Sequence, residues 1–201
     1  MSRPRGVRGT VLIRVFETVE ELLGEKSRRI LESATGVRLE ELNPGEWYPV
    51  DTYIALRRGL EDMLGPAARV VLFRVGYRAS TSLASNRFGR DIRGLLGAPT
   101  GDWERIGPAI VGIIEERLGI GRASYSVGGG GLVVRIYDSL ESTYGSPSGK
   151  PICHMTRGLL RFLGETFTGG AVEVVETRCR AAGDPYCEFH LKPLRATPAS
   201  P

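Results

Sequence analysis

The sequence contains no glutamine, only two asparagines and only three lysines among its 201 residues. Amide side chains are thermolabile, so their scarcity fits a heat-adapted source, although scarce lysine is not the usual thermophile signal and genome composition also explains it. The source matters for the three cysteines. Disulfides inside cells are rare except in hyperthermophiles, so a heat-adapted source would leave a disulfide open.

The chain also lacks an apolar run of about 20 residues, the length needed to cross a bilayer. Residues 1–6 lack the apolar stretch of a signal peptide. We therefore expect a cytoplasmic protein. The net charge is +4, but no long basic block and no nucleic-acid motif is present, so nucleic acid is not the expected partner.

The composition that is present is ordinary for a folded protein, with 41% hydrophobic and 25% charged residues. A length of 201 residues is typical of one domain rather than two. We expect a basic lead-in over residues 1–8, a single domain over 9–192 and a flexible tail over 193–201. Within the domain, residues 9–119 form a helical half and residues 120–192 an α+β half.

Apolar residues recur every three or four positions along the first half, which is the period of one helix face. The first three predicted helices end at Gly24, Gly36 and Gly65, because glycine favours helix ends. The predicted helices span residues 11–23, 25–35, 51–64, 67–83 and 103–118. A short helix around Ile92 is also expected.

The pattern changes after residue 119. Short β-prone runs at 123–127 and 132–137 flank four glycines, which we interpret as a hairpin turn because no phosphate-loop Lys-Ser/Thr follows them. A helix over 151–167 comes next, and a second hairpin follows with strands at 172–177 and 187–191. This order predicts an α+β fold: N-terminal helices packed with a C-terminal antiparallel sheet of two hairpins with an intervening helix.

Three cysteines and one glutamate form the candidate site. Cys153 lies at a predicted helix start, where free N–H groups and the helix dipole favour a thiolate. Glu176 and Cys179 end one strand of the second hairpin, and Cys187 begins the returning strand. Zinc favours four tetrahedral Cys, His or carboxylate ligands, and a closed set is structural. The four residues are therefore the predicted ligands of a structural Zn²⁺ ion.

Other interpretations stay open from the residues alone. The cysteines can be inert core thiols, because free cysteine is among the most buried residue types. A disulfide between Cys179 and Cys187 is the third possibility, and His154 and His190 are candidate substitute ligands. The zinc interpretation also requires a bend or bulge at 177–178, since residues three apart face opposite sides of a regular strand.

A family resemblance enters at these residues. The segment Cys-His-Met-Thr-Arg-Gly from Cys153, with the E-x2-C-x7-C run from Glu176 to Cys187 and the Gly-Asp turn inside it, resembles the 4-vinyl reductase (4VR) domain family. The resemblance covers the last third of the chain and implies zinc bound by Cys153, Glu176, Cys179 and Cys187. It also implies the fold of NO-signalling and Golgi-transport ligand-binding proteins, a homodimer, and a hydrophobic small molecule held between helices and sheet.

These features lead to one main functional hypothesis, a stand-alone module that binds or senses a hydrophobic or aromatic molecule and signals through dimer contacts or a separate regulatory protein. The alternatives are a tetrapyrrole 4-vinyl reductase and a non-catalytic assembly or scaffold subunit. No nucleophile–base pair, dinucleotide fingerprint or open metal site supports an enzyme. Ligand pockets are largely apolar and aromatic, although each aromatic residue can equally be plain core. The expected lining residues are Trp47, Tyr48, Tyr53, Trp103, Tyr137, Phe162 and Phe167.

Overall fold

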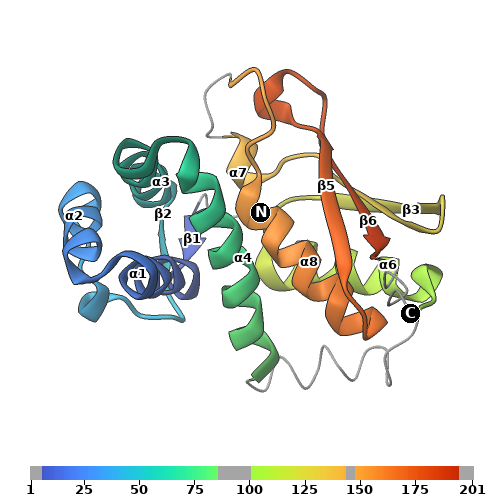
Figure 1. Cartoon of the computed structure of the whole chain (residues 1–201), viewed down its shortest axis with the longest axis horizontal. Helices are drawn as coiled ribbons and strands as arrows, with labels where there is room; N and C mark the ends of the chain where they lie inside the picture. Colours follow the sequence, from blue (N-terminus) through green and yellow to red (C-terminus); the bar gives the residue numbers. More distant parts are fainter. Residues whose placement is uncertain (1–5, 86–100, 144–147, 195–201) are drawn as a thin grey trace, which may run out of the picture.

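A computed structural model describes residues 6–85, 101–143 and 148–194. The helical half comes first and the sheet half follows, and Figure 1 shows them meeting along helices α4 and α8. The helical half contains α1 (Gly9–Leu23), α2 (Glu25–Thr35), α3 (Val50–Leu64) and α4 (Ala68–Ser85). The sheet half contains α6 (Trp103–Gly112) with a π-helical turn at Ile113–Leu118, α7 (Leu140–Thr143) and α8 (His154–Thr168).

The five helices predicted in the first half are present because their apolar spacing matches a buried face. In α1, Leu12, Val15, Phe16 and Val19 are all fully buried. Gly24 ends this helix with a φ of 84° and donates its N–H to the carbonyl of Glu20. The fifth predicted helix is regular only to Gly112, since its last turns are π-helical. The short helix expected around Ile92 lies outside the described residues.

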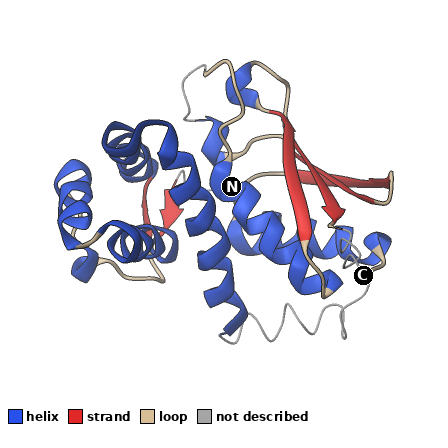
Figure 2. Cartoon of the chain, viewed as in Figure 1, coloured by secondary structure: helices blue, strands red, loops and turns tan. Residues whose placement is uncertain are grey.

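The sheet half is built on four antiparallel strands in the order β3-β4-β6-β5 (Figure 2). The strands are β3 (Ala123–Gly128), β4 (Gly131–Ile136), β5 (Val172–Arg178) and β6 (Cys187–Pro193). The two predicted hairpins therefore join through β4 and β6, which places Cys187 opposite Ile136 in the middle of the sheet. The predicted α+β architecture is confirmed.

A small second sheet was not predicted. Strand β1 (Gly6–Arg8) pairs antiparallel with β2 (Trp47–Pro49), so Gly6–Arg8, expected to be part of a lead-in, belong to the folded unit. The Arg8 guanidinium lies 4.3 Å from the centroid of the Trp47 ring. The remaining parts of the expected lead-in and tail, residues 1–5 and 195–201, lie outside the described residues.

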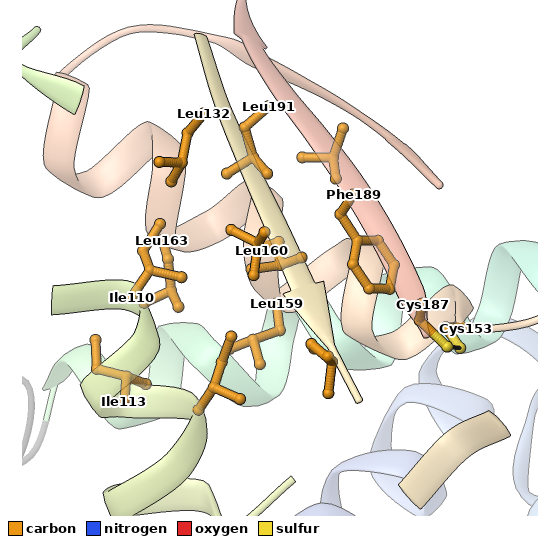
Figure 3. Packing of buried hydrophobic residues seen from close by; sticks show 14 of the residues in the cluster. Ile110, Ile113, Leu132, Cys153, Leu159, Leu160, Leu163, Cys187, Phe189 and Leu191 are labelled. Atoms are coloured by element: carbon orange, nitrogen blue, oxygen red, sulfur yellow. Dashed lines mark hydrogen bonds between the residues drawn. The ribbon is translucent and has the colours of Figure 1, made fainter. Parts of the chain in front are cut away.

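Each half has its own buried apolar cluster. Figure 3 shows the cluster of the sheet half, in which α6 and α8 face the inner side of the sheet, with Cys153 and Cys187 at its border. The labelled apolar members are Ile110, Ile113, Leu132, Leu159, Leu160, Leu163, Phe189 and Leu191. The cluster of the helical half includes Leu12, Phe16, Leu31, Leu56, Leu60 and Leu72.

The two halves join where α4 crosses α8, and two glycines permit the close approach. A Cβ atom on Gly76 would meet the backbone of Met155, and a Cβ atom on Gly158 would meet the backbone at Phe73 and Tyr77. Any larger residue at either position would push the helices apart. In the part of the chain that the structure describes, no helix is both long and apolar enough to span a membrane.

Candidate metal centre

Helix α8 positions Cys153, and a buried carboxylate fixes where that helix starts. Cys153 directly precedes α8 and is fully buried. The carboxylate of Glu141, on α7, accepts the backbone N–H groups of Met155 and Thr156, both at 3.0 Å, and the Thr156 hydroxyl at 2.9 Å. It thereby satisfies two free N–H groups of the first helical turn and faces the positive end of the helix dipole.

Sequence reasoning missed Glu141. The residue is 14 positions away from Met155, outside the local spacing of any capping motif. Burial raises the pKa of Glu141 to about 7, although the hydrogen bonds from the start of α8 lower it. The carboxyl group is thus a structural part of the helix start that holds Cys153.

The other three residues of the group come from the hairpin of β5 and β6. Pairing between these strands is irregular between Glu176 and Arg178. This is the bulge that the zinc interpretation requires, because the extra residue lets Glu176 and Cys179 face the same side. Cys187 begins β6 and completes the group.

The Gly-Asp turn shapes the loop around Cys179. The Cys179 carbonyl accepts the N–H groups of Ala182 and Asp184, and the Asp184 carboxylate accepts the Cys179 N–H at 2.8 Å. Gly183 has a φ of 103°, in the left-handed region that favours glycine. These residues hold the loop closed rather than supply ligand atoms.

The four side chains meet at one point. The Cys153 sulfur lies 3.8 Å from that of Cys179 and 3.6 Å from that of Cys187, and the last two are 4.0 Å apart. With a carboxylate oxygen of Glu176, all four ligand atoms lie within 4.8 Å of one another. Tetrahedral Zn–S bonds of about 2.3 Å place sulfur atoms about 3.8 Å apart. The chain therefore has a buried Cys3Glu group that can hold a metal ion.

The other interpretations fit this geometry less well. All three cysteines are free, and their sulfur atoms are much further apart than the roughly 2.05 Å of a disulfide. The Oε2 atom of Glu176 accepts the N–H of Cys153 at 3.0 Å, whereas its Oε1 atom is buried without a hydrogen-bond partner. An unpartnered buried carboxylate oxygen is costly, and a cation would satisfy it. Neither histidine replaces a ligand, because His154 lines a cavity and His190 contacts Glu188.

The charge state of the group also favours a cation. Burial raises the pKa of Glu176 to about 8. Hydrogen bonds from Cys153 and Cys179 lower the pKa of Cys187 to about 3, and the same sharing raises the pKa of Cys153. A metal dication would displace the remaining protons. The N–H of Arg180 also points to the Cys187 sulfur, at 3.5 Å.

Two cavities border the start of α8. One of about 270 Å³ lies between the two halves and extends from Gly6 in β1 to Leu159 in α8. The other, of about 530 Å³, lies against α3, the start of α4 and the segment before α8. Tyr53 and Glu141 line both cavities and so stand between them.

The structure brings only part of the expected aromatic set to these cavities. Trp47 and Tyr53 line the smaller one. Of the others, Trp103 and Phe167 lie in the sheet-half core, Phe162 packs edge-on against Tyr77, Tyr137 is exposed beside Tyr186, and the Tyr48 hydroxyl accepts the N–H of Asn43.

Relatives with similar sequences come from an archaeon. The chain is 26% identical to the uncharacterized protein MJ0150 of Methanocaldococcus jannaschii over 173 residues, which cover 86% of this chain and 92% of that protein. It is 43% identical to the uncharacterized protein MJ0855 of the same organism over 63 residues, which cover 30% of this chain and only 27% of that protein.

Solved structures with a similar fold include sensory proteins. An H-NOX protein from S. oneidensis in the Fe(II)NO ligation state aligns with a TM-score of 0.68 at 12% identity, covering 94% of this chain and all of that one. The phenol-responsive sensory domain of the transcription activator PoxR, solved with phenol, aligns with a TM-score of 0.56 at 19% identity, covering 84% and 90%.

The family model of the 4VR domain, named for 4-vinyl reductase, matches residues 132–193. This region contains β4, α8, the β5–β6 hairpin and all four residues of the Cys3Glu group. The match confirms the resemblance to the 4-vinyl reductase family. Residues 132–193 are therefore a 4VR domain, within a chain that has the α+β fold of H-NOX proteins and of the PoxR sensory domain.

Proposed function

We propose that the chain binds a small apolar or aromatic molecule in the 270 Å³ cavity, and that a structural zinc ion stabilises one wall of that cavity. The position of the cavity carries the proposal. It lies between the helical and sheet halves, and its wall includes Met155 and Thr156, in the first turn after Cys153. The metal ligands and the cavity thus share one helix start.

The chemistry of the cavity wall supports an apolar ligand. Val11 and Leu159 contribute aliphatic surface, Trp47 and Tyr53 contribute rings, and Thr156 is one of the few polar groups. Pockets of this kind bind through shape and apolar contact, with polar groups that fix orientation. The volume lies near the lower end of the roughly 300–1,000 Å³ of drug-sized sites, so we expect a single-ring aromatic or a short aliphatic molecule.

The structural neighbours support a small-molecule role for this fold, since the PoxR domain is phenol-responsive and was solved with phenol. The chain has two histidines, and neither lines the 270 Å³ cavity. A haem held by histidine is therefore not favoured. The tetrapyrrole reductase alternative would need a ligand much larger than this cavity, and an assay with a divinyl pigment under reducing conditions tests it directly.

Zinc is the metal that we propose for the Cys3Glu group. Thiolates with one carboxylate suit zinc, and four protein ligands leave no position for a substrate. When bound, zinc supplies folding free energy and draws the four side chains into one shell. The chain's own residues then hold the start of α8 against the β5–β6 hairpin, which is a structural rather than a catalytic role.

Native mass spectrometry of the purified full chain tests ligand binding, because a molecule held in an enclosed apolar cavity should remain bound. Binding of phenol and of hexanoate should then be measured by calorimetry for the wild type and for Ala79→Leu. Ala79 lines the cavity and leucine would fill part of it. The control is Ala55→Leu, a half-buried position on α3 that lines neither cavity.

We expect a copurified or added apolar ligand whose binding is lost in Ala79→Leu and kept in Ala55→Leu. Equal binding by both variants, or no ligand at all, would leave the scaffold alternative instead. Signalling through a homodimer or a separate regulatory protein belongs to the same proposal. Light scattering with and without the bound ligand tests the dimer.

A further inference from the structure

We infer that the 530 Å³ cavity is a second binding site, and that its ligand is a phosphorylated small molecule. The cavity lies on the other side of Tyr53 and Glu141 from the apolar cavity. Its wall combines α3 and α4 of the helical half with the segment that leads into α8. The inference rests on its own lining residues and does not depend on the apolar ligand.

Positive charge gathers around this cavity from three separate parts of the chain. Arg57 and Arg58 come from α3, Arg69 from α4 and Lys150 from the segment before α8. Among the described residues, the side chains of Arg58, Arg69 and Lys150 have no ion-pair or hydrogen-bond partner. Three unpaired cations that converge on one cavity favour an anion with more than one negative charge.

The acidic residues at the cavity do not cancel this charge. Glu61 binds the Arg57 guanidinium at 2.9 Å, and that guanidinium also donates to the Glu141 carbonyl at 3.3 Å. The Glu141 carboxylate is already occupied by the start of α8. Arg57 is therefore a fixed part of the wall, and the unpaired cations remain available to a ligand.

The size and the remaining lining indicate the kind of anion. A volume of about 530 Å³ is more than a bare phosphate ion needs, and it lies within the roughly 300–1,000 Å³ typical of small-molecule sites. Ile54, Leu72 and Ile152 add apolar surface to the wall. Arginine is the residue best suited to phosphate oxygens, which it binds with two parallel N–H groups. A phosphate group attached to an organic part fits both features.

Isothermal titration calorimetry on the zinc-loaded full chain tests the inference. The probes are ADP, ribose 5-phosphate and pyrophosphate, with adenosine as the uncharged comparison. The test variant combines Arg58→Gln and Arg69→Gln. The matched control is Arg74→Gln, an exposed arginine on α4 that does not line the cavity.

We expect one phosphorylated probe to saturate a single site and to bind more weakly as salt is added. Each lost arginine should weaken binding about tenfold, so the double variant should lose roughly a hundredfold while Arg74→Gln keeps wild-type affinity. Pyrophosphate binding as tight as ADP binding would show that the phosphates alone carry recognition, which contradicts a role for the organic part.

The inference would be overturned by three results. No phosphorylated probe saturates at millimolar concentration; adenosine binds as tightly as ADP; or the double variant binds like the wild type at an unchanged melting temperature. None of these bears on the Ala79→Leu experiment, which probes the other cavity, so the two conclusions can fail separately.

Discussion

Replacement of Cys153 by serine tests whether the Cys3Glu group holds zinc. A neutral hydroxyl is a poor zinc ligand compared with a thiolate, so the variant should lose the metal. A metal at about 100 to 1,000 times its Kd stabilises the folded state by about 2.7 to 4.1 kcal/mol. For a chain of 201 residues, each kcal/mol shifts Tm by about 2 to 4 °C. The expected loss is therefore roughly 5 to 16 °C.

Scanning calorimetry of the wild type and Cys153→Ser, each with and without a chelator, measures this loss. Elemental analysis of reduced protein purified without chelator should find one zinc per wild-type chain. The chelator should lower the wild-type Tm to near that of the variant and should change the variant little. A packing defect caused by serine would instead persist in the chelator, because it does not depend on metal.

Two outcomes would refute the metal centre. The first is a wild-type chain without stoichiometric metal whose Tm the chelator leaves unchanged. The second is a Tm deficit of Cys153→Ser that is equal with and without chelator. Either result would return the cysteines to the role of inert core thiols, which the sequence alone left open.

Three further predictions concern pH and packing. Zinc content after dialysis should fall as pH falls, because the thiols and Glu176, whose pKa burial raises to about 8 without metal, must lose protons to bind; zinc retained unchanged in acid would contradict this. Glu141→Gln should flatten the pH dependence of Tm. The folded pKa of Glu141 is about 7 against an ordinary 4.5, so its contribution is complete below the lower value and is lost as pH rises through the upper one; an unchanged slope in melts across this window would argue against it. Gly158→Ala should destabilise by about 1 to 3 kcal/mol, since its Cβ would meet the α4 backbone. Gly112→Ala, with open space around it, should instead stabilise by about 0.5 to 1 kcal/mol; equal effects in urea unfolding would rule out a close crossing.

The elements that the sequence predicted best are those governed by local spacing. The helix of Leu12 to Val19 and the turn at Gly183 follow from periodicity and backbone preference, which neighbouring residues determine. The bulge beside Glu176 could also be deduced, because strand alternation leaves few ways to bring that residue and Cys179 together.

The features that were missed depend on partners distant in sequence. Strand β1 needs β2, and Glu141 caps a helix that begins beyond an intervening loop. The aromatic set shows the same limit. Periodicity indicates that Trp103 and Phe167 are buried, but it cannot tell a residue in the core from one that lines a cavity. The tertiary contacts of α4 and α8 decide that difference.

The start of α8 links the three sites. Cys153 belongs to the metal centre, His154 lines the cationic cavity, and Met155 and Thr156 line the apolar cavity. The Glu141 carboxylate binds the last two and borders both cavities. A ligand that moves this turn in either cavity must also move Cys153 relative to Cys187 on the sheet. Because a tetrahedral shell tolerates little displacement, zinc restricts that turn to one arrangement, and ligand affinity in each cavity is thereby tied to the metal.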